Sequence, residues 1–136
     1  MIEFHKQAMK YVGVPFKHRG RTQRGMDCVG LLICSARDCG YTKYQEFAYG
    51  REPRNSELEA VLEKHFGKPQ DRPPQVNDVV LMRLRYGSEP SHVGIITDHP
   101  SGLGIIHAYG EIGKVTYQRF TDEMARRVTG VYQWQE

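Results

Sequence analysis

The stretch Arg24-Gly25-Met26-Asp27-Cys28-Val29-Gly30-Leu31-Leu32 places a thiol between an acidic residue and an apolar run. From the thiol onward, one set of side chains recurs at helical spacing: Cys28, Leu31, Leu32, Ser35 and Cys39. This spacing predicts a helix that ends at Gly40. Asp27 is a natural N-cap, so Cys28 lies in the first turn, where unpaired backbone N–H groups and the helix dipole favour a thiolate.

A buried structural role is the alternative for each cysteine, because cysteine is among the most buried residue types. We adopt that interpretation for Cys34 and Cys39, which lie well inside the predicted helix. For Cys28 the helix position leaves both interpretations open, and a nearby base would decide between them. The three cysteines are odd in number and close in sequence, which predicts reduced thiols rather than a disulfide framework.

The length and composition restrict the class of protein. A chain of 136 residues predicts one domain, residues 1–136. Its net charge of +3 is compatible with an anionic substrate and too weak to indicate nucleic acid. The amino terminus does not resemble a signal peptide, and no apolar run approaches the roughly 20 residues of a membrane helix. We therefore expect a protein made in the cytoplasm, with no membrane span and no nucleic-acid partner.

Helical patterns occupy the first half of the chain and strand patterns the second. Residues 2–12 predict a short helix, 15–25 a loop and 41–55 an irregular connection, and a capping box at Ser56 predicts a helix that ends before Gly67. Five strands are expected, at 78–84, 91–97, 103–109, 114–120 and 128–134, with a helical turn near 121–127. Helices followed by an antiparallel sheet predict the α+β class, with the helices packed on the sheet.

Two histidines interrupt apolar strands and supply candidates for the base. His92 lies in Ser91-His92-Val93-Gly94-Ile95, and His107 lies in Ile105-Ile106-His107-Ala108. If residues 98–101 close the hairpin, Thr97 pairs with Gly102 and His92 lies directly opposite His107 on one face. The two rings would then touch, whereas a register changed by one residue would place them on opposite faces.

The three reactive residues permit two kinds of site. In a catalytic Cys–His–His arrangement, Cys28 is the nucleophile, His92 is the base that forms a thiolate–imidazolium pair, and His107 orients the His92 ring. The same side chains could instead hold zinc, but no close ligand pair is present and we expect no metal and no organic cofactor. The remaining histidines are interpreted as surface or loop residues: His5, His18, His65 and His99.

Five segments, in chain order, resemble the motifs of the NlpC/P60 cell-wall peptidases. They are Tyr11-Val12-Gly13-Val14-Pro15-Phe16, Gly25-Met26-Asp27-Cys28-Val29-Gly30-Leu31-Leu32, Asn77-Asp78-Val79-Val80-Leu81, Ser91-His92-Val93-Gly94-Ile95 and Ile106-His107-Ala108. A Pro-aromatic-x-His segment and the carboxyl end Thr129-Gly130-Val131-Tyr132-Gln133-Trp134 are similar to the small members of this family in tailed bacteriophages and prophages. The resemblance covers nearly the whole chain.

This resemblance implies a papain-like α+β fold and a cysteine peptidase of peptidoglycan stem peptides. The bond usually cut in the family joins D-glutamate, through its γ-carboxyl, to diaminopimelate or lysine. By position, Cys28 is the nucleophile, His92 the base and His107 the orienting residue. Substrate contacts are expected from five further residues: Asp27, Phe16, His18, Arg19 and Ser91.

The chain departs from the family pattern at three places. Phe16 stands where many members have a tyrosine hydroxyl beside the active site, so the second donor to the oxyanion is unidentified. Arg19-Gly20 replaces a frequent Gly-Gly, and Val76-Asn77-Asp78 replaces Pro-Gly-Asp. The triad positions are intact, which favours an active enzyme with altered substrate contacts.

The resemblance also implies where the protein acts and with what. We expect a phage or prophage tail protein that reaches the bacterial cell wall or periplasm, with the peptidoglycan stem peptide and phage tail proteins as partners. The alternative is a structural tail-tip or assembly protein that keeps the fold without much peptidase activity. An acyltransferase or amidase of the wider superfamily is a third possibility, but permuted members of that kind carry the histidine before the cysteine.

Overall fold

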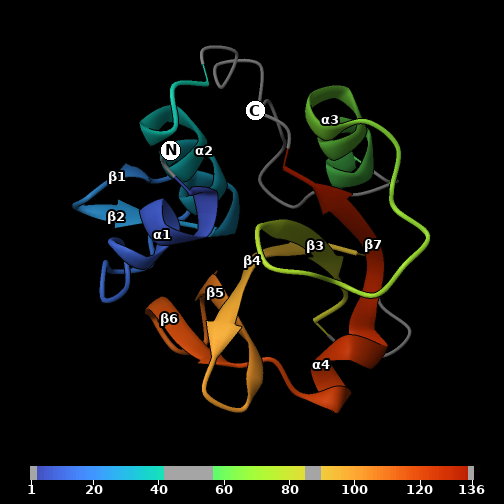
Figure 1. The fold of residues 1–136 in the computed structure, drawn as a ribbon. Coiled ribbons are helices and arrows are strands. Elements are labelled where there is room, and N and C mark those ends of the chain that lie inside the picture. Colours follow the sequence, from blue (N-terminus) through green and yellow to red (C-terminus); the bar gives the residue numbers. More distant parts are fainter. Residues whose placement is uncertain (1–2, 42–56, 85–89, 135–136) are drawn as a thin grey trace.

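The computed structural model of the chain describes residues 3–41, 57–84 and 90–134 (Figure 1). Its helices are α1 (Phe4–Met9), α2 (Cys28–Asp38), α3 (Glu57–Phe66) and α4 (Asp122–Arg127). Its strands are β1 (Arg21–Thr22), β2 (Gly25–Met26), β3 (Asp78–Met82), β4 (His92–His99), β5 (Gly102–Tyr109), β6 (Lys114–Arg119) and β7 (Val128–Gln133). The predicted connection at 41–55, apart from Tyr41, and the predicted cap at Ser56 lie outside the described residues.

The α+β prediction is confirmed. Strands β3 to β7 form an antiparallel five-stranded sheet in the order β6-β5-β4-β3-β7, and each begins and ends within about two residues of its predicted bounds. The segment 15–25 was predicted as a loop, but it contains most of the small hairpin of β1 and β2. Each of these strands has two residues, which is too short to produce a hydrophobic period.

The predicted register of the β4–β5 hairpin is wrong by two residues. Gly102 pairs with His99 rather than with Thr97, because β4 continues through Asp98 to His99 and the turn is correspondingly shorter. A shift by an even number of residues preserves the face, so His92 and His107 still lie on the same side of the sheet. The two rings consequently meet on the diagonal rather than directly opposite each other, at a centroid distance of 5.0 Å.

One main core lies between the helices and the sheet. Helices α1 and α2 contact each other and also β4 and β5, and Figure 1 shows them together on one side of the sheet. Eight consecutive residues of α2, Val29–Ala36, are buried, so this helix is enclosed on nearly all sides. Gly30 permits close approach of the preceding loop, because a Cβ there would lie 2.0 Å from the Gly20 carbonyl oxygen.

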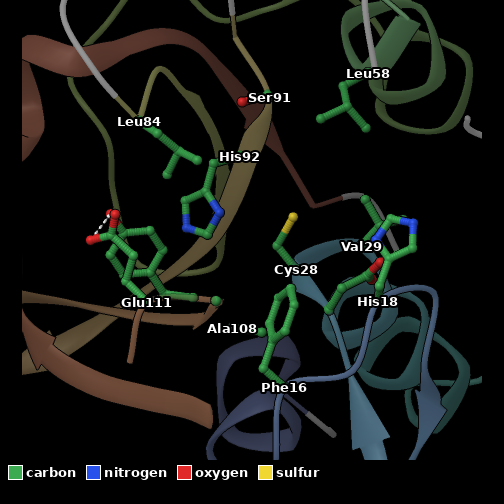
Figure 2. Close-up of a pocket in the computed structure, with 13 residues that line it drawn as sticks. Phe16, His18, Cys28, Val29, Leu58, Leu84, Ser91, His92, Ala108 and Glu111 are labelled. Atoms are coloured by element: carbon green, nitrogen blue, oxygen red, sulfur yellow. Dashed lines mark hydrogen bonds between the residues drawn. The ribbon is translucent and has the colours of Figure 1, made fainter. Parts of the chain in front are cut away.

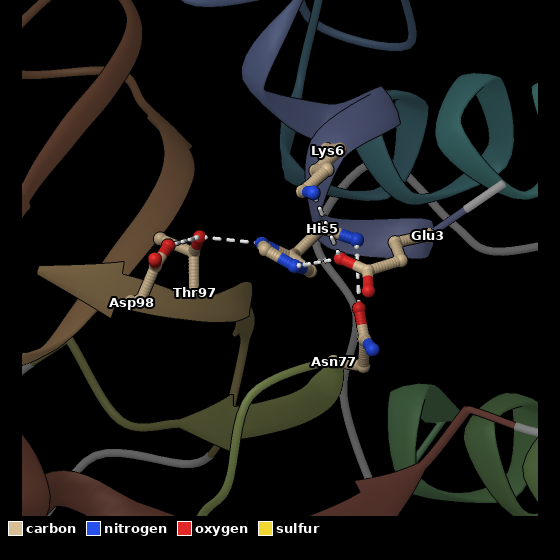
Figure 3. A network of polar contacts seen from close by, with 6 residues as sticks. All are labelled: Glu3, His5, Lys6, Asn77, Thr97 and Asp98. Atoms are coloured by element: carbon tan, nitrogen blue, oxygen red, sulfur yellow. Dashed lines mark hydrogen bonds and ion pairs between the residues drawn. The ribbon is translucent and has the colours of Figure 1, made fainter.

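A buried polar network ties α1 to the sheet (Figure 3). The ring of His5 lies 2.7 Å from Thr97 Oγ1 through Nδ1 and 2.8 Å from Glu3 Oε2 through Nε2. The His5 backbone N–H donates to Asn77 Oδ1, in the turn before β3. The prediction that His5 is a surface or loop residue is therefore wrong, because its ring fills a buried position with both nitrogens bonded.

Aromatic side chains from α1, α3 and the carboxyl end pack together in the same core. The Phe4 and Trp134 rings stack with their centroids 4.3 Å apart. The Tyr41 hydroxyl forms a short hydrogen bond with Nδ1 of His65 on α3. His65, predicted as a surface or loop residue, lies on α3 and is partly buried. Among the described residues, no helix is both long and apolar enough to cross a membrane.

Candidate active site

Asp27 fixes the start of α2 and thereby the position of the Cys28 thiol. Its Oδ1 accepts from the Gly30 backbone N–H at 2.7 Å, which is the predicted N-cap interaction. Its Oδ2 accepts from the Arg19 backbone N–H at 2.8 Å, so one carboxylate holds both the helix and the preceding loop. Cys28 is the first residue of the helix and is partly buried.

Arg19 has a backbone conformation that favours the glycine of the family pattern. Its φ is 60°, in the left-handed region that favours glycine, and this conformation directs its N–H toward Asp27. A glycine, which the resemblance leads us to expect here, would adopt that conformation without strain. Arg19 thus contributes a backbone hydrogen bond to the position of Asp27.

A row of hydrogen bonds runs from His92 across the sheet. His92 Nε2 lies 2.7 Å from His107 Nδ1, and His107 Nε2 lies 2.9 Å from Gln118 Oε1 on β6. Gly94 makes room for the Ile105 side chain beside these residues, because a Cβ at Gly94 would lie 2.5 Å from Ile105 Cδ1, whereas its distance of 3.5 Å from the Cβ of His107 would be an ordinary contact. Because Nε2 of His92 is hydrogen-bonded to His107, Nδ1 is the nitrogen of His92 that can exchange a proton with a substrate or a thiol.

Cys28 and His92 line the same cavity, of about 400 Å³ (Figure 2). The Cys28 side chain enters from α2 and the His92 ring from the start of β4, with His18 on the far side of Cys28 from His92. The cavity is lined by Phe16, His18, Asp27, Cys28, Val29, Leu58, Leu84, Ser91, His92, Ala108, Tyr109, Gly110 and Glu111. His107 lies behind His92 and does not line it, as expected of a residue that orients the ring.

The environment of Cys28 favours the neutral thiol. Burial, and then the negative charge of Asp27, raise the pKa of the Cys28 thiol to about 12. The backbone N–H groups of Val93, Val29 and Cys28 itself act in the opposite direction and lower it. The expected stabilisation by the helix terminus is therefore present but is outweighed by desolvation.

The two histidines are held neutral as well. Burial is the main cause that lowers the pKa of His92 below its ordinary 6.5; repulsion from the His107 ring, whenever that ring is protonated, and the positive charge of Arg127 lower it further. Burial also lowers the pKa of His107, against the hydrogen bond to Gln118, which raises it. These surroundings thus favour a thiol and a neutral imidazole rather than the expected thiolate–imidazolium pair. A neutral His92 is the protonation state in which a histidine acts as a general base.

The structure brings together most of the residues expected to contact substrate. Phe16, His18, Asp27 and Ser91 line the cavity, whereas Arg19 does not. Asp27 is buried and has both carboxylate oxygens bonded to backbone N–H groups, which gives it a structural role beside any contact with substrate. The Phe16 ring lies against Gly110, where an added Cβ would be 3.6 Å away, and it presents no hydrogen-bond donor.

Sequence reasoning missed three polar side chains of the site. Tyr109 and Glu111 line the cavity, and the Tyr109 hydroxyl donates to Glu111 Oε2 at 3.1 Å. Gln118 ends the row of hydrogen bonds that begins at His92. Glu111 lies in the turn after β5, close in sequence to His107. This closeness could have identified Glu111 as a candidate site residue. Gln118 could be found only from the β5–β6 register.

The zinc alternative has no support in the geometry. Within the parts of the chain that the structure describes, no three His, Cys, Asp or Glu side chains are grouped so that they could hold a metal ion. Cys28, His92 and His107 are all described, so these three do not form a ligand set.

Comparison with known proteins matches the chain to one family model and to solved structures of one fold. The NlpC/P60 family model matches residues 13–133. An NLPC/P60 family protein from Bacillus cereus ATCC 10987 has a similar structure, with a TM-score of 0.65, 17% identity, and coverage of 98% of this chain and 40% of that protein. A Staphylococcus aureus subsp. aureus Mu50 protein, described as similar to lipoprotein of the NLP/P60 family, also has a similar structure. Its TM-score is 0.62 at 18% identity, and the match covers 96% of this chain and 39% of that protein.

These similarities confirm the predicted fold. At identities below one fifth they show the fold alone, and the chain spans about two fifths of the length of each of these two proteins. A search of curated proteins found no match.

Proposed function

The chain belongs to the NlpC/P60 family, a family of cysteine peptidases, and on that basis we propose that it hydrolyses peptidoglycan stem peptides. The observation that carries the proposal is the shared cavity of Cys28 and His92, in which the Nε2 of His92 contacts His107, whereas its Nδ1 has no hydrogen bond to any residue that the structure describes. A thiol and an imidazole placed in this way are the components of nucleophilic catalysis.

The arrangement supports acyl transfer through a thioester. The proton of Cys28 moves to His92 Nδ1 as the sulfur attacks the scissile carbonyl carbon, and the C–N bond then breaks as His92 returns the proton to the leaving amine. Water hydrolyses the thioester in the second half, with His92 again taking a proton. The Cys28 backbone N–H is one donor for the oxyanion, and His18, which lines the cavity on the side of Cys28 away from His92, is a side-chain candidate for the second.

We propose that the bond cut is the one between the γ-carboxyl of D-glutamate and diaminopimelate or lysine. His92 protonates the leaving amine, so the leaving residue lies on the His92 side of Cys28. The Glu111 carboxylate is on that side, because it bonds to Tyr109, whose ring lies 5.7 Å from the His92 ring. A leaving residue that carries an ammonium group on its side chain complements this carboxylate.

Mass spectrometry of purified muropeptides tests the proposal. Incubation with the protein should release fragments that end at the D-glutamate γ-carboxyl, and Cys28→Ala should release none. The matched control is Cys34→Ala, which removes a buried thiol whose Sγ donates to the Arg21 backbone oxygen and should leave cleavage unchanged. No cleavage by wild-type protein that circular dichroism shows to be folded would contradict the proposal.

We also propose that the protein is associated with a phage or prophage tail. The support is the resemblance of its Pro-aromatic-x-His segment and its carboxyl end to small phage proteins of this family. Quantitative mass spectrometry of purified tails after prophage induction should find the protein enriched over the lysate, and its absence from the particles would contradict the association. Presence in tails without muropeptide cleavage would favour the structural tail protein, a role that the donor-free side chain of Phe16 allows.

A further inference from the structure

Gln118 lies outside the cavity but at the end of the hydrogen-bonded row that starts at the proposed base. It lies on β6, where Thr116 pairs with His107 and Gln118 pairs with Ile105. His107 and Ile105 are two residues apart on β5, so Gln118 is the diagonal neighbour of His107 on the same face. Its Oε1 is 2.9 Å from His107 Nε2.

The oxygen of the Gln118 amide determines which atoms donate in the His107–Gln118 and His92–His107 hydrogen bonds. A carbonyl oxygen only accepts, so His107 Nε2 carries the proton. A neutral imidazole has one N–H, so His107 Nδ1 accepts, and the donor across the 2.7 Å contact is His92 Nε2. His92 therefore holds its own proton on Nε2, and its Nδ1 has a free lone pair.

The neighbouring threonine is consistent with an oxygen at this position. Thr116 Oγ1 lies 3.3 Å from Gln118 Oε1 and 3.4 Å from the backbone oxygen of His107, so its hydroxyl proton faces two acceptors. The opposite orientation of the amide would place an NH₂ group against His107 Nε2. It would force His107 to donate to His92 and would put the proton of His92 on Nδ1, where it blocks the base.

We propose that Gln118 is a positioning residue that selects the tautomer of His107 and, through it, the tautomer of His92 that leaves Nδ1 open to Cys28. In this role the partly buried glutamine is a fixed acceptor at the end of the hydrogen-bonded row that begins at His92. Its importance for turnover rests on the proposed function, whereas its effect on the tautomers does not.

Nitrogen NMR of the ring-labelled protein tests the tautomers without any substrate. Long-range ¹H–¹⁵N spectra at neutral pH should show His92 and His107 both protonated at Nε2. Gln118→Met, which has a similar volume and no acceptor of comparable strength, should give a mixture of tautomers at both rings. Gln118→Glu keeps an acceptor-only oxygen and should restore the Nε2-protonated form of His107.

Kinetics on a stem peptide give the second readout. Gln118→Met should lower kcat by about 10- to 100-fold with little change in KM, as expected for a residue that orients a functional ring. Gln118→Glu should recover most of kcat and shift the acid limb of the pH profile, because the carboxylate favours a charged His107. The matched control is Tyr117→Phe, on the next position of β6, which removes a hydrogen bond to the Asp98 backbone oxygen and should change neither tautomers nor kcat.

Two results would overturn the inference: a wild-type His92 protonated at Nδ1, or tautomers that stay unchanged in Gln118→Met. A protein that shows the expected tautomers and cleaves no stem peptide would leave the inference intact and contradict the proposed function instead.

Discussion

Two buried histidine networks in this protein differ in one respect. His5 and His92 are each 5% exposed, and both networks involve β4, one near its end at Thr97 and the other at its first residue. The ring of His5 has both nitrogens bonded, to Thr97 and Glu3 (Figure 3). The ring of His92 has Nε2 bonded to His107, while among the described residues no hydrogen bond reaches its Nδ1.

The difference distinguishes a histidine with a structural role from one that can transfer a proton in a reaction. A ring with both nitrogens satisfied can hold elements together but has no lone pair for a substrate or a thiol. A ring held at one nitrogen and open at the other toward a cavity keeps its orientation and its basicity. Burial alone does not distinguish the two, because the exposed fractions of the two residues are equal.

The largest effect is expected at His92. His92→Asn removes the proposed base, so kcat/KM on a stem peptide should fall by about 10⁴-fold, the size found when a triad member is lost. Urea unfolding should show a smaller loss of stability than the His5 substitution produces. Activity retained within tenfold of wild type would show that the open nitrogen of His92 has no catalytic meaning.

His5 should show the opposite behaviour. His5→Leu removes the buried hydrogen bond between the imidazole and Thr97 Oγ1, while the contact of Thr97 Oγ1 with Asp98 Oδ1 remains, and losing one such bond should cost about 0.5–1.5 kcal/mol of unfolding free energy. The kcat/KM of the protein that remains folded should equal that of wild type. A drop in kcat/KM beyond the folded fraction measured by circular dichroism would erase the distinction between the two networks.

The pH dependence sharpens the comparison further. The lowered pKa of His92 keeps the base neutral in mild acid, so the acid limb of kcat/KM should lie below 6.5, and the raised pKa of Cys28 should place the alkaline limb above 9.0. An acid limb at or above 6.5 would contradict the protonation states assigned to the site.

Stability should follow the same pKa values. Because the pKa values of His92 and His107 are lowered in the folded state, the unfolded chain binds more protons below 6.5. Their contribution to stability is therefore complete above 6.5 and is lost as the pH falls below it. Urea unfolding at pH 5 and 7 should show a smaller pH effect when both residues are replaced by Gln, and an unchanged pH effect would contradict this assignment.

The smallest effect is expected at Glu111. This exposed carboxylate should favour an ammonium group on the leaving residue, so Glu111→Gln should raise KM by a few-fold for a lysine-containing stem peptide. The same peptide with norleucine in place of lysine should show no such change. Equal effects on both peptides would indicate that Glu111 acts on the fold of the turn rather than on charge.

The helices and strands with a regular hydrophobic pattern could be predicted from the sequence. Helix α2 and its Asp27 cap follow from the spacing of Leu31, Leu32 and Ser35, and the strands of the main sheet follow from their alternating and apolar runs. The contact between His92 and His107 was also predicted, although through a register that was wrong by two residues. An even error preserves the face, so the conclusion was correct while the turn was not.

The remainder depends on contacts between distant segments. His5 was taken for a surface residue because nothing in its neighbourhood shows that Thr97 will lie 2.7 Å from its ring. Gln118 was missed because its position beside His107 depends on the β5–β6 pairing. The pKa of Cys28 was expected to fall at the helix terminus, but the degree of burial, which outweighs the helix, is a property of the assembled cavity.

Labelling by a γ-D-glutamyl fluoromethyl ketone is the measurement that tests the central claim most directly. This probe places an electrophilic ketone carbon where the scissile carbonyl of the proposed substrate would lie, and the chain offers Cys34 and Cys39 as internal controls. Peptide mapping should find one adduct, on Cys28, formed at similar rates in wild type and His5→Leu and at least about 10³-fold more slowly in His92→Asn. Equal labelling of the three cysteines, or an undiminished rate in His92→Asn, would contradict the account.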